Sequence, residues 1–108
     1  MRLRYTERSI RHLENIRRYI AADNPRAAER VRARIFASVK MLRTLPRLGH
    51  VGRIAGTREL PVAHLPYAIV YRIDMSHNVE SGTHNEDELV ILGIFHGARE
   101  NWEDFSDD

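Results

Sequence analysis

Residues 6–45, TERSIRHLENIRRYIAADNPRAAERVRARIFASVKMLRTL, decide the fold because they contain two amphipathic helical patterns in succession. Thr6 offers a hydroxyl N-cap for a first helix over residues 7–22. Apolar side chains recur on one stripe of that helix, and arginines lie away from the stripe. The stripe residues are Ile10, Leu13, Ile16 and Ile20. We therefore expect this helix to pack one face against the rest of the protein and to expose the other.

A second helix is predicted from Pro25 to about Leu45. Asn24 is a favoured cap, proline suits the first helical position, and Pro46 stops the helix. Its apolar stripe consists of Ala28, Val31, Ile35, Val39 and Leu42. Only Ala22–Asn24 separates the two helices, so they should be antiparallel neighbours whose apolar stripes need a sheet to cover them.

The remaining sequence supplies strands for that sheet. Leu3 and Tyr5 predict a short first strand, and three later stretches are rich in β-branched and apolar residues. These stretches are Thr57–Val62, Ala68–Met75 and Glu88–His96. Both faces of the last one are apolar, which is typical of an interior strand.

Two stretches without clear periodicity, Pro46–Gly56 and Ser76–Asp87, are predicted to be loops. The expected fold is therefore α+β. It has an N-terminal strand, an antiparallel helical hairpin packed on a mainly antiparallel β-sheet, and a short C-terminal segment, all in a single domain over residues 1–108.

Composition bounds the class of protein. The chain of 108 residues contains no cysteine, which fits a reducing compartment. The N-terminal run Met1–Tyr5 is too charged for a signal peptide, and the longest apolar run, Leu89–Phe95, is too short to span a bilayer. We expect a cytoplasmic protein that does not bind membranes.

The net charge of +2 conceals a strong asymmetry along the chain. Residues 1–60 contain 15 Lys and Arg against 5 Asp and Glu, whereas residues 61–108 contain 2 against 10. The formal charges of the two parts are thus +10 and −8. A basic part of this strength favours an anionic partner, either a nucleic acid or an acidic polypeptide.

Four short motifs occur in a fixed order along the chain. They are Asn24-Pro25-x-Ala27-Ala28, Gly56-Thr57-Arg58-Glu59-Leu60, Pro66-Tyr67-x-Ile69-Val70-Tyr71-Arg72 and His96-Gly97-Ala98-Arg99. Together with the order of the expected elements, they resemble the RelE/ParE toxins of bacterial type II toxin–antitoxin systems. The resemblance implies a growth-inhibiting toxin that is held silent in a hetero-oligomer with a cognate antitoxin protein. It implies no cofactor.

The superfamily divides into branches with different targets, and the sequence favours the ParE-like branch. Members similar to RelE cut messenger RNA on the ribosome, whereas members similar to ParE inhibit DNA gyrase. Where the RelE pattern has an arginine in the third predicted strand, this chain has Ala68. The C-terminal segment is acidic around Trp102 and Phe105, and acidic groups repel a phosphate backbone. The ParE-like reading, a non-catalytic binder of gyrase, is therefore favoured, with a ribosome-dependent endoribonuclease as the alternative.

The two readings assign different roles to the same side chains. A metal-free ribonuclease needs an acid/base group among cationic donors, and the candidates for that site are His96, Arg99, Arg58 and Arg72. The candidates for binding a partner are Arg58, Leu60, Tyr67, Arg72, His96, Arg99 and Trp102. Structural roles stay open for them, since Arg58 and Arg72 could each pair with Glu59 or Asp74 inside the protein.

Metal and nucleotide sites are not expected. No two of His50, His64, His77 and His84 have the i, i+4 spacing of ligands on one helix, and no thiolate is present. The glycines of the loop after the second helix neither follow a strand nor open a helix, so they do not form a dinucleotide-binding fingerprint.

Overall fold

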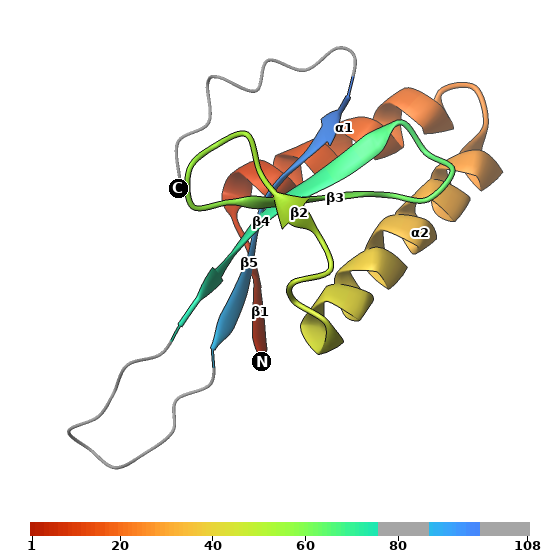
Figure 1. Cartoon of the computed structure of the whole chain (residues 1–108). Helices are drawn as coiled ribbons and strands as arrows, with labels where there is room; N and C mark the ends of the chain where they lie inside the picture. Colours follow the sequence, from red (N-terminus) through yellow and green to blue (C-terminus); the bar gives the residue numbers. More distant parts are fainter. Residues whose placement is uncertain (76–86, 98–108) are drawn as a thin grey trace.

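The structure is a computed structural model that describes residues 1–75 and 87–97. The elements follow one another as β1 (Arg2–Tyr5), α1 (Glu7–Ala21), α2 (Pro25–Thr44), β2 (His50–Val51), β3 (Arg58–Pro61), β4 (Tyr67–Asp74) and β5 (Glu88–His96). The predicted α+β class is confirmed, because a helical hairpin packs on a five-stranded sheet (Figure 1).

Side-chain caps define the starts of both helices, as the sequence predicts. The hydroxyl oxygen of Thr6 accepts a hydrogen bond from the Ser9 amide at 3.2 Å. The side-chain oxygen of Asn24 accepts one from the Ala27 amide at 3.1 Å, and Pro25 is the first residue of α2. The two helices are joined by a tight turn and lie beside each other (Figure 1).

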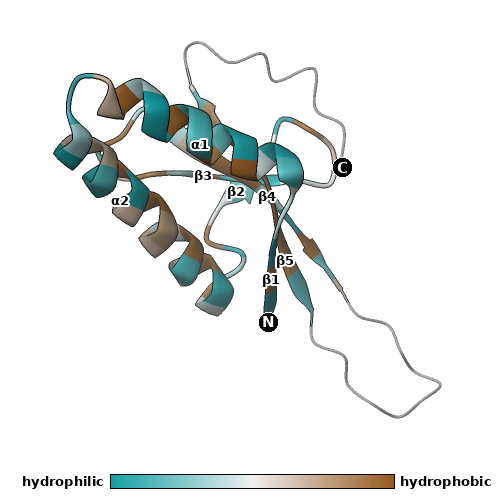
Figure 2. Cartoon of the chain, turned by 180° about the vertical axis from the view of Figure 1, so that it is seen from behind, coloured by the Kyte–Doolittle hydropathy of each residue, from teal (hydrophilic) through white to brown (hydrophobic). Residues whose placement is uncertain are grey.

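The sheet has the strand order β1-β5-β4-β3-β2. β1 pairs with β5 in parallel, and the other three pairs are antiparallel. β5 therefore lies between β1 and β4, which confirms the prediction that Glu88–His96 is an interior strand. The helical hairpin covers one face of the sheet, and α1 crosses in front of the strands when the chain is seen from behind (Figure 2).

One element was not predicted. β2 lies inside the stretch Pro46–Gly56, so the prediction of a loop over that whole stretch is wrong. The strand has only two residues, His50 and Val51, and both are exposed. A strand this short has no alternating pattern to detect, and it exists because its backbone pairs with β3.

The main core lies between the helical hairpin and the sheet. Ile35, Val39 and Leu42 of α2 pack there with buried side chains of β4 and β5, and Leu13 and Ile16 of α1 pack against this cluster. The first residue of the predicted stripe on α1 behaves differently. Ser9 is fully buried and its hydroxyl donates to the Thr6 carbonyl, whereas Ile10, about 100° further around the helix, lies off the packed face and is 55% exposed. The expectation that Ile10 packs with the stripe is wrong for this reason.

The cross-strand register places alternate residues on opposite faces of the sheet. Leu60 pairs with Ile69, and Arg58 pairs with Tyr71, so these four residues face the helices. Val70 faces the other way and forms a second buried cluster with Val90, Leu92 and Phe95. The motif residues of β3 and β4 are thereby divided between the two faces.

Candidate functional site

Tyr67 and His96 meet at the end of the sheet where β4 begins and β5 ends. They are direct cross-strand partners, and their rings lie edge to face with centroids 5.6 Å apart. Both had been singled out from the sequence as candidates for binding a partner. The structure brings these two residues together and places both on the wall of a cavity.

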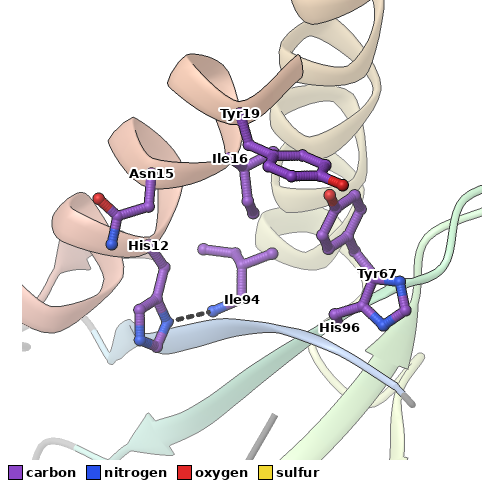
Figure 3. Close-up of a pocket in the computed structure, with 7 residues that line it drawn as sticks. All are labelled: His12, Asn15, Ile16, Tyr19, Tyr67, Ile94 and His96. Atoms are coloured by element: carbon purple, nitrogen blue, oxygen red, sulfur yellow. Dashed lines mark hydrogen bonds between the residues drawn. The ribbon is translucent and has the colours of Figure 1, made fainter. Parts of the chain in front are cut away.

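This cavity has a volume of about 350 Å³ and lies between α1 and the end of the sheet. Helix α1 supplies four of its lining residues, namely His12, Asn15, Ile16 and Tyr19. Figure 3 shows the side chains of Tyr19 and Tyr67 extending toward one another from α1 and β4. Among the described residues, no lysine or arginine lines this cavity.

His12 has a defined structural role on the cavity wall. Its Nδ1 accepts a hydrogen bond from the Ile94 backbone amide at 3.1 Å (Figure 3). A ring nitrogen that accepts a hydrogen bond carries no proton, so the hydrogen of the neutral ring is on Nε2. The ring also stands edge to face against Phe95, with centroids 4.9 Å apart. His12 therefore connects α1 to the part of β5 that lies beyond its pairing with β1.

A second bond between the same two elements comes from Thr6. Its hydroxyl lies 3.1 Å from the Ile91 carbonyl oxygen and 3.2 Å from the Leu92 carbonyl oxygen, and donates toward them. The Ile91 carbonyl also accepts from the Thr6 backbone amide at 3.1 Å, and Leu92 is the first residue of β5 beyond the β1–β5 pairing, which ends at Ile91. The pairing of β4 with β5 also shifts register between Val70 and Tyr71. Thr6 and His12 thus bond to the part of β5 that lies beyond its pairing with β1.

Arg58 is engaged with the backbone of the loop that follows α2. Its Nη2 donates to the Gly49 carbonyl at 2.6 Å and to the Arg47 carbonyl at 3.2 Å, and its Nε donates to Gly49 at 3.0 Å. Arg58 therefore binds neither Glu59 nor Asp74, the two internal partners considered from the sequence. Glu59 is buried and instead accepts from the backbone and guanidinium of Arg53, at 2.8 and 3.3 Å.

Arg72 lies on the opposite face of the sheet from Arg58. Its Nε donates to Asp74 Oδ1 at 2.7 Å, which is one of the internal pairs considered from the sequence. Leu60 faces the helices and packs, partly buried, against the main core. Arg99 and Trp102 lie outside the described residues. Among the described candidates, Tyr67 and His96 are thus brought into contact with each other.

A second cavity, of about 280 Å³, lies between the two helices. Its wall is mostly apolar, and it includes Tyr5, whose pKa is raised because burial disfavours the phenolate. At its rim Glu14 binds Arg17, with 2.6 Å between Glu14 Oε1 and Arg17 Nη2. This hydrogen bond lowers the pKa of Glu14 from 4.5 to about 2.

The chemistry available at the cavity beside Tyr67 is that of imidazole, phenol and amide groups. Such groups suit hydrogen bonding and ring stacking with a partner. Within the described ranges, no three His, Asp or Glu side chains gather as metal ligands would. In the same part of the chain, no helix is long and apolar enough to cross a membrane.

Several of these residues were not identified from the sequence. His12, Asn15 and Tyr19 share one side of α1 that adjoins the apolar stripe at Ile16, and the periodicity of the stripe does not identify them. The spacing of His12 and Tyr19, two turns apart, was a usable signal. The sequence does not predict the contacts of Tyr71 with the loop after α2, because they depend on the register of the sheet.

Comparisons with known proteins agree with the fold and with the motifs. Residues 3–101 match the family of ParE toxins of the type II toxin–antitoxin system parDE. A protein of Sinorhizobium fredii, named "Putative toxin Y4kP", is 44% identical over 101 residues, which cover 94% of this chain and 92% of that protein.

A solved structure of the chromosomal ParDE toxin–antitoxin system from P. aeruginosa has a similar fold. Its TM-score is 0.68 at 22% identity, and the match covers 89% of this chain and 95% of that chain. At that identity the likeness concerns the fold alone. The family match and the Sinorhizobium relative both span nearly the whole sequence. This protein therefore belongs to the ParE family of type II toxin–antitoxin toxins.

Proposed function

We propose that this toxin inhibits growth by binding DNA gyrase and that a cognate antitoxin neutralises it by direct binding. Membership of the ParE family supports this reading over cleavage of messenger RNA. The site of action is then the cytoplasm, where gyrase meets DNA. The protein acts in this proposal as a binder and not as an enzyme.

The placement of the arginines favours gyrase over messenger RNA as the target. A metal-free ribonuclease must place cationic donors around the group that moves the proton. Arg58 donates to two backbone carbonyls on the helix side of the sheet, and Arg72 binds Asp74 on the other side. His96 lies at the end of β5, beside a cavity in which the described lining has no cation. The described candidates therefore do not form a single catalytic cluster.

The charge of the chain and its structural similarity to a known toxin support the proposal that an antitoxin binds it. The basic part of the chain has a formal charge of +10, which favours association with an acidic polypeptide. The structurally similar chain comes from a ParDE toxin–antitoxin system. A toxin–antitoxin hetero-oligomer is the assembly that we propose for this chain as well.

The test is a supercoiling assay with purified gyrase, run with the toxin alone and with its antitoxin. A ribosome-dependent cleavage assay on messenger RNA should use the same toxin preparation. We expect inhibition of supercoiling that the antitoxin reverses, and intact messenger RNA. Codon-positioned cuts with gyrase unaffected would contradict the proposal. In that case His96→Ala and Arg99→Ala should lower the cleavage rate and preserve antitoxin binding.

A further inference from the structure

The stretch that runs from the last turn of α2 through the following loop into β2 exposes large apolar side chains. Exposure is 52% for Met41, 56% for Leu45, 43% for Leu48 and 76% for Val51. In Figure 1 this segment, yellow-green, turns back from the end of α2 toward β2. We call these four residues and the exposed Arg47 the docking surface. Exposed apolar side chains gathered in one short segment are typical of an interaction site.

The backbone beneath the docking surface is fixed from inside the protein. The Tyr71 hydroxyl donates to the Pro46 carbonyl at 2.7 Å and accepts from the Gly49 amide at 2.9 Å. Arg58 adds its bonds to the Arg47 and Gly49 carbonyls. A Cβ atom at Gly49 would lie 2.6 Å from the Tyr71 hydroxyl oxygen and 2.7 Å from the Glu59 carbonyl oxygen, so this approach requires glycine. The loop is therefore held in one shape before any partner arrives.

The stretch of sequence that contains the docking surface is basic. Between Glu29 and Glu59 the sequence contains eight Lys and Arg and no Asp or Glu. Glu59 itself is buried and bonded to Arg53, so its charge is neutralised locally. The electrostatic potential of this region thus favours a partner surface that carries carboxylates.

We propose that the docking surface binds an acidic, apolar region of a folded protein and that this protein is gyrase. The inference rests on the function proposed above and names the part of the toxin that meets the target. The exposed side chains are aliphatic, whereas surfaces that bind single-stranded nucleic acid present aromatic rings for stacking. A preformed surface suits a folded partner, because neither side then loses much conformational entropy on binding.

The experiment measures the affinity of each toxin variant for purified gyrase and for the antitoxin. Two variants change the docking surface, Arg47→Glu and Leu48→Ser. Two matched controls make the same kind of change at other exposed positions. Arg26→Glu reverses a charge at the opposite end of α2, which is about 27 Å long from Arg26 to Thr44, and Met75→Ser removes an exposed methionine after β4. Thermal unfolding verifies that all four variants are folded.

We expect each docking-surface variant to lose about tenfold or more in affinity for gyrase, while both controls bind as the wild type does. The affinity of each of the four variants for the antitoxin should stay within about threefold of the wild-type affinity. Equal binding of gyrase by wild type and docking-surface variants would overturn the inference and leave the proposed function standing. A wild-type toxin that does not bind gyrase would overturn both.

Two further results would assign the surface to a different partner. If the docking-surface variants still bind gyrase but no longer bind the antitoxin, the docking surface is the binding site for the antitoxin and the inference is wrong. A parallel experiment measures binding of the toxin to a fluorescent duplex oligonucleotide in the absence of gyrase. If wild type binds this duplex and Arg47→Glu does not, the partner is nucleic acid and the inference is wrong.

Discussion

Tyr71 connects the sheet to the loop after α2 through a single hydroxyl group. It is fully buried in β4, and its oxygen serves both as donor to Pro46 and as acceptor from Gly49. A buried hydroxyl with two backbone partners leaves both of them without a bond when it is removed. The residue thus has a role that neither its aromatic ring nor its place in a strand would indicate.

We expect Tyr71→Phe to lower the free energy of unfolding by about 1–3 kcal/mol, because the buried Gly49 amide and the partly buried Pro46 carbonyl lose their partner while the ring packing remains. Urea unfolding measures this change. Hydrogen exchange gives a local readout, since the Gly49 amide should exchange faster in the variant than in wild type. An unchanged exchange rate at Gly49 would show that the hydroxyl does not hold the loop.

Glu14 provides a prediction about pH. Its pKa of about 2 lies below the usual 4.5, chiefly because of the hydrogen bond from Arg17. A lowered carboxyl pKa means that the pair stabilises the folded state fully above pH 4.5 and that this contribution is lost as the pH falls through about 2. An NMR titration of the Glu14 carboxyl carbon should give a midpoint near the lower value.

Arg17→Gln is the control for this titration. It should raise the Glu14 midpoint toward 4.5, because the largest cause of the shift is gone while Arg18 remains. Because the pair is exposed on the helix surface, the change in stability should be small. A midpoint near 4.5 already in wild type would mean that the ion pair does not persist in solution.

How far a side chain's role can be predicted depends on whether it is set locally. The caps Thr6 and Asn24 were predictable because a cap acts within three residues of its own position. The partners of Arg58 were not, because Gly49 and Arg47 approach it only through the pairing of β2 with β3. Arg72 lies between these cases, since Asp74 is its neighbour on the same face of one strand.

At the scale of elements, the junction between α1 and β5 holds the sheet and the helices together. Thr6 caps the helix and also donates to β5, and His12 accepts from β5 one and a half turns later. One helix edge thereby completes the hydrogen bonding of a strand whose neighbour β1 is short. The cavity beside Tyr67 lies next to this junction, so its shape depends on it.

We expect Thr6→Val to lower the free energy of unfolding by about 1–2 kcal/mol, since the cap and the bonds to β5 are lost together while the shape of the side chain is kept. Chemical denaturation measures the loss. Thr6→Ser is the matched control, because it retains the hydroxyl and should stay close to wild type. If valine and serine have equal effects, packing and not hydrogen bonding governs the junction.

The elements themselves were largely predictable, and the exceptions share a cause. The helices and the longer strands carry their own periodicity, so their bounds agree with the sequence to within about two residues. β2 has no pattern of its own and is created by its partner β3. The cavity was not predictable either, because α1 meets the end of β5 only through tertiary packing.

At the scale of the whole molecule, the uneven distribution of charge is the most prominent property of the chain. The basic part includes both helices, β2 and the motif arginine of β3. Charge of one sign over a large part of a small protein attracts partners of opposite sign over distances comparable to the Debye length, about 10 Å at 0.1 M salt.

We therefore expect the association rate of the toxin with gyrase to fall by about tenfold or more between about 0.05 and 0.5 M salt, with a smaller change in the dissociation rate. Surface plasmon resonance at several salt concentrations separates the two rates. An association rate that does not depend on salt would mean that the basic part of the chain does not guide the encounter.

The parallel pairing of β1 with β5 joins the beginning of the described chain to its last strand, with Arg2 opposite Glu88. A polypeptide emerging from the ribosome cannot complete this pairing until residue 91 has been translated, and contacts so distant in sequence form slowly. The helical hairpin needs only local contacts and can form much earlier. The order of synthesis thus imposes a delay between making the basic helices and completing the sheet.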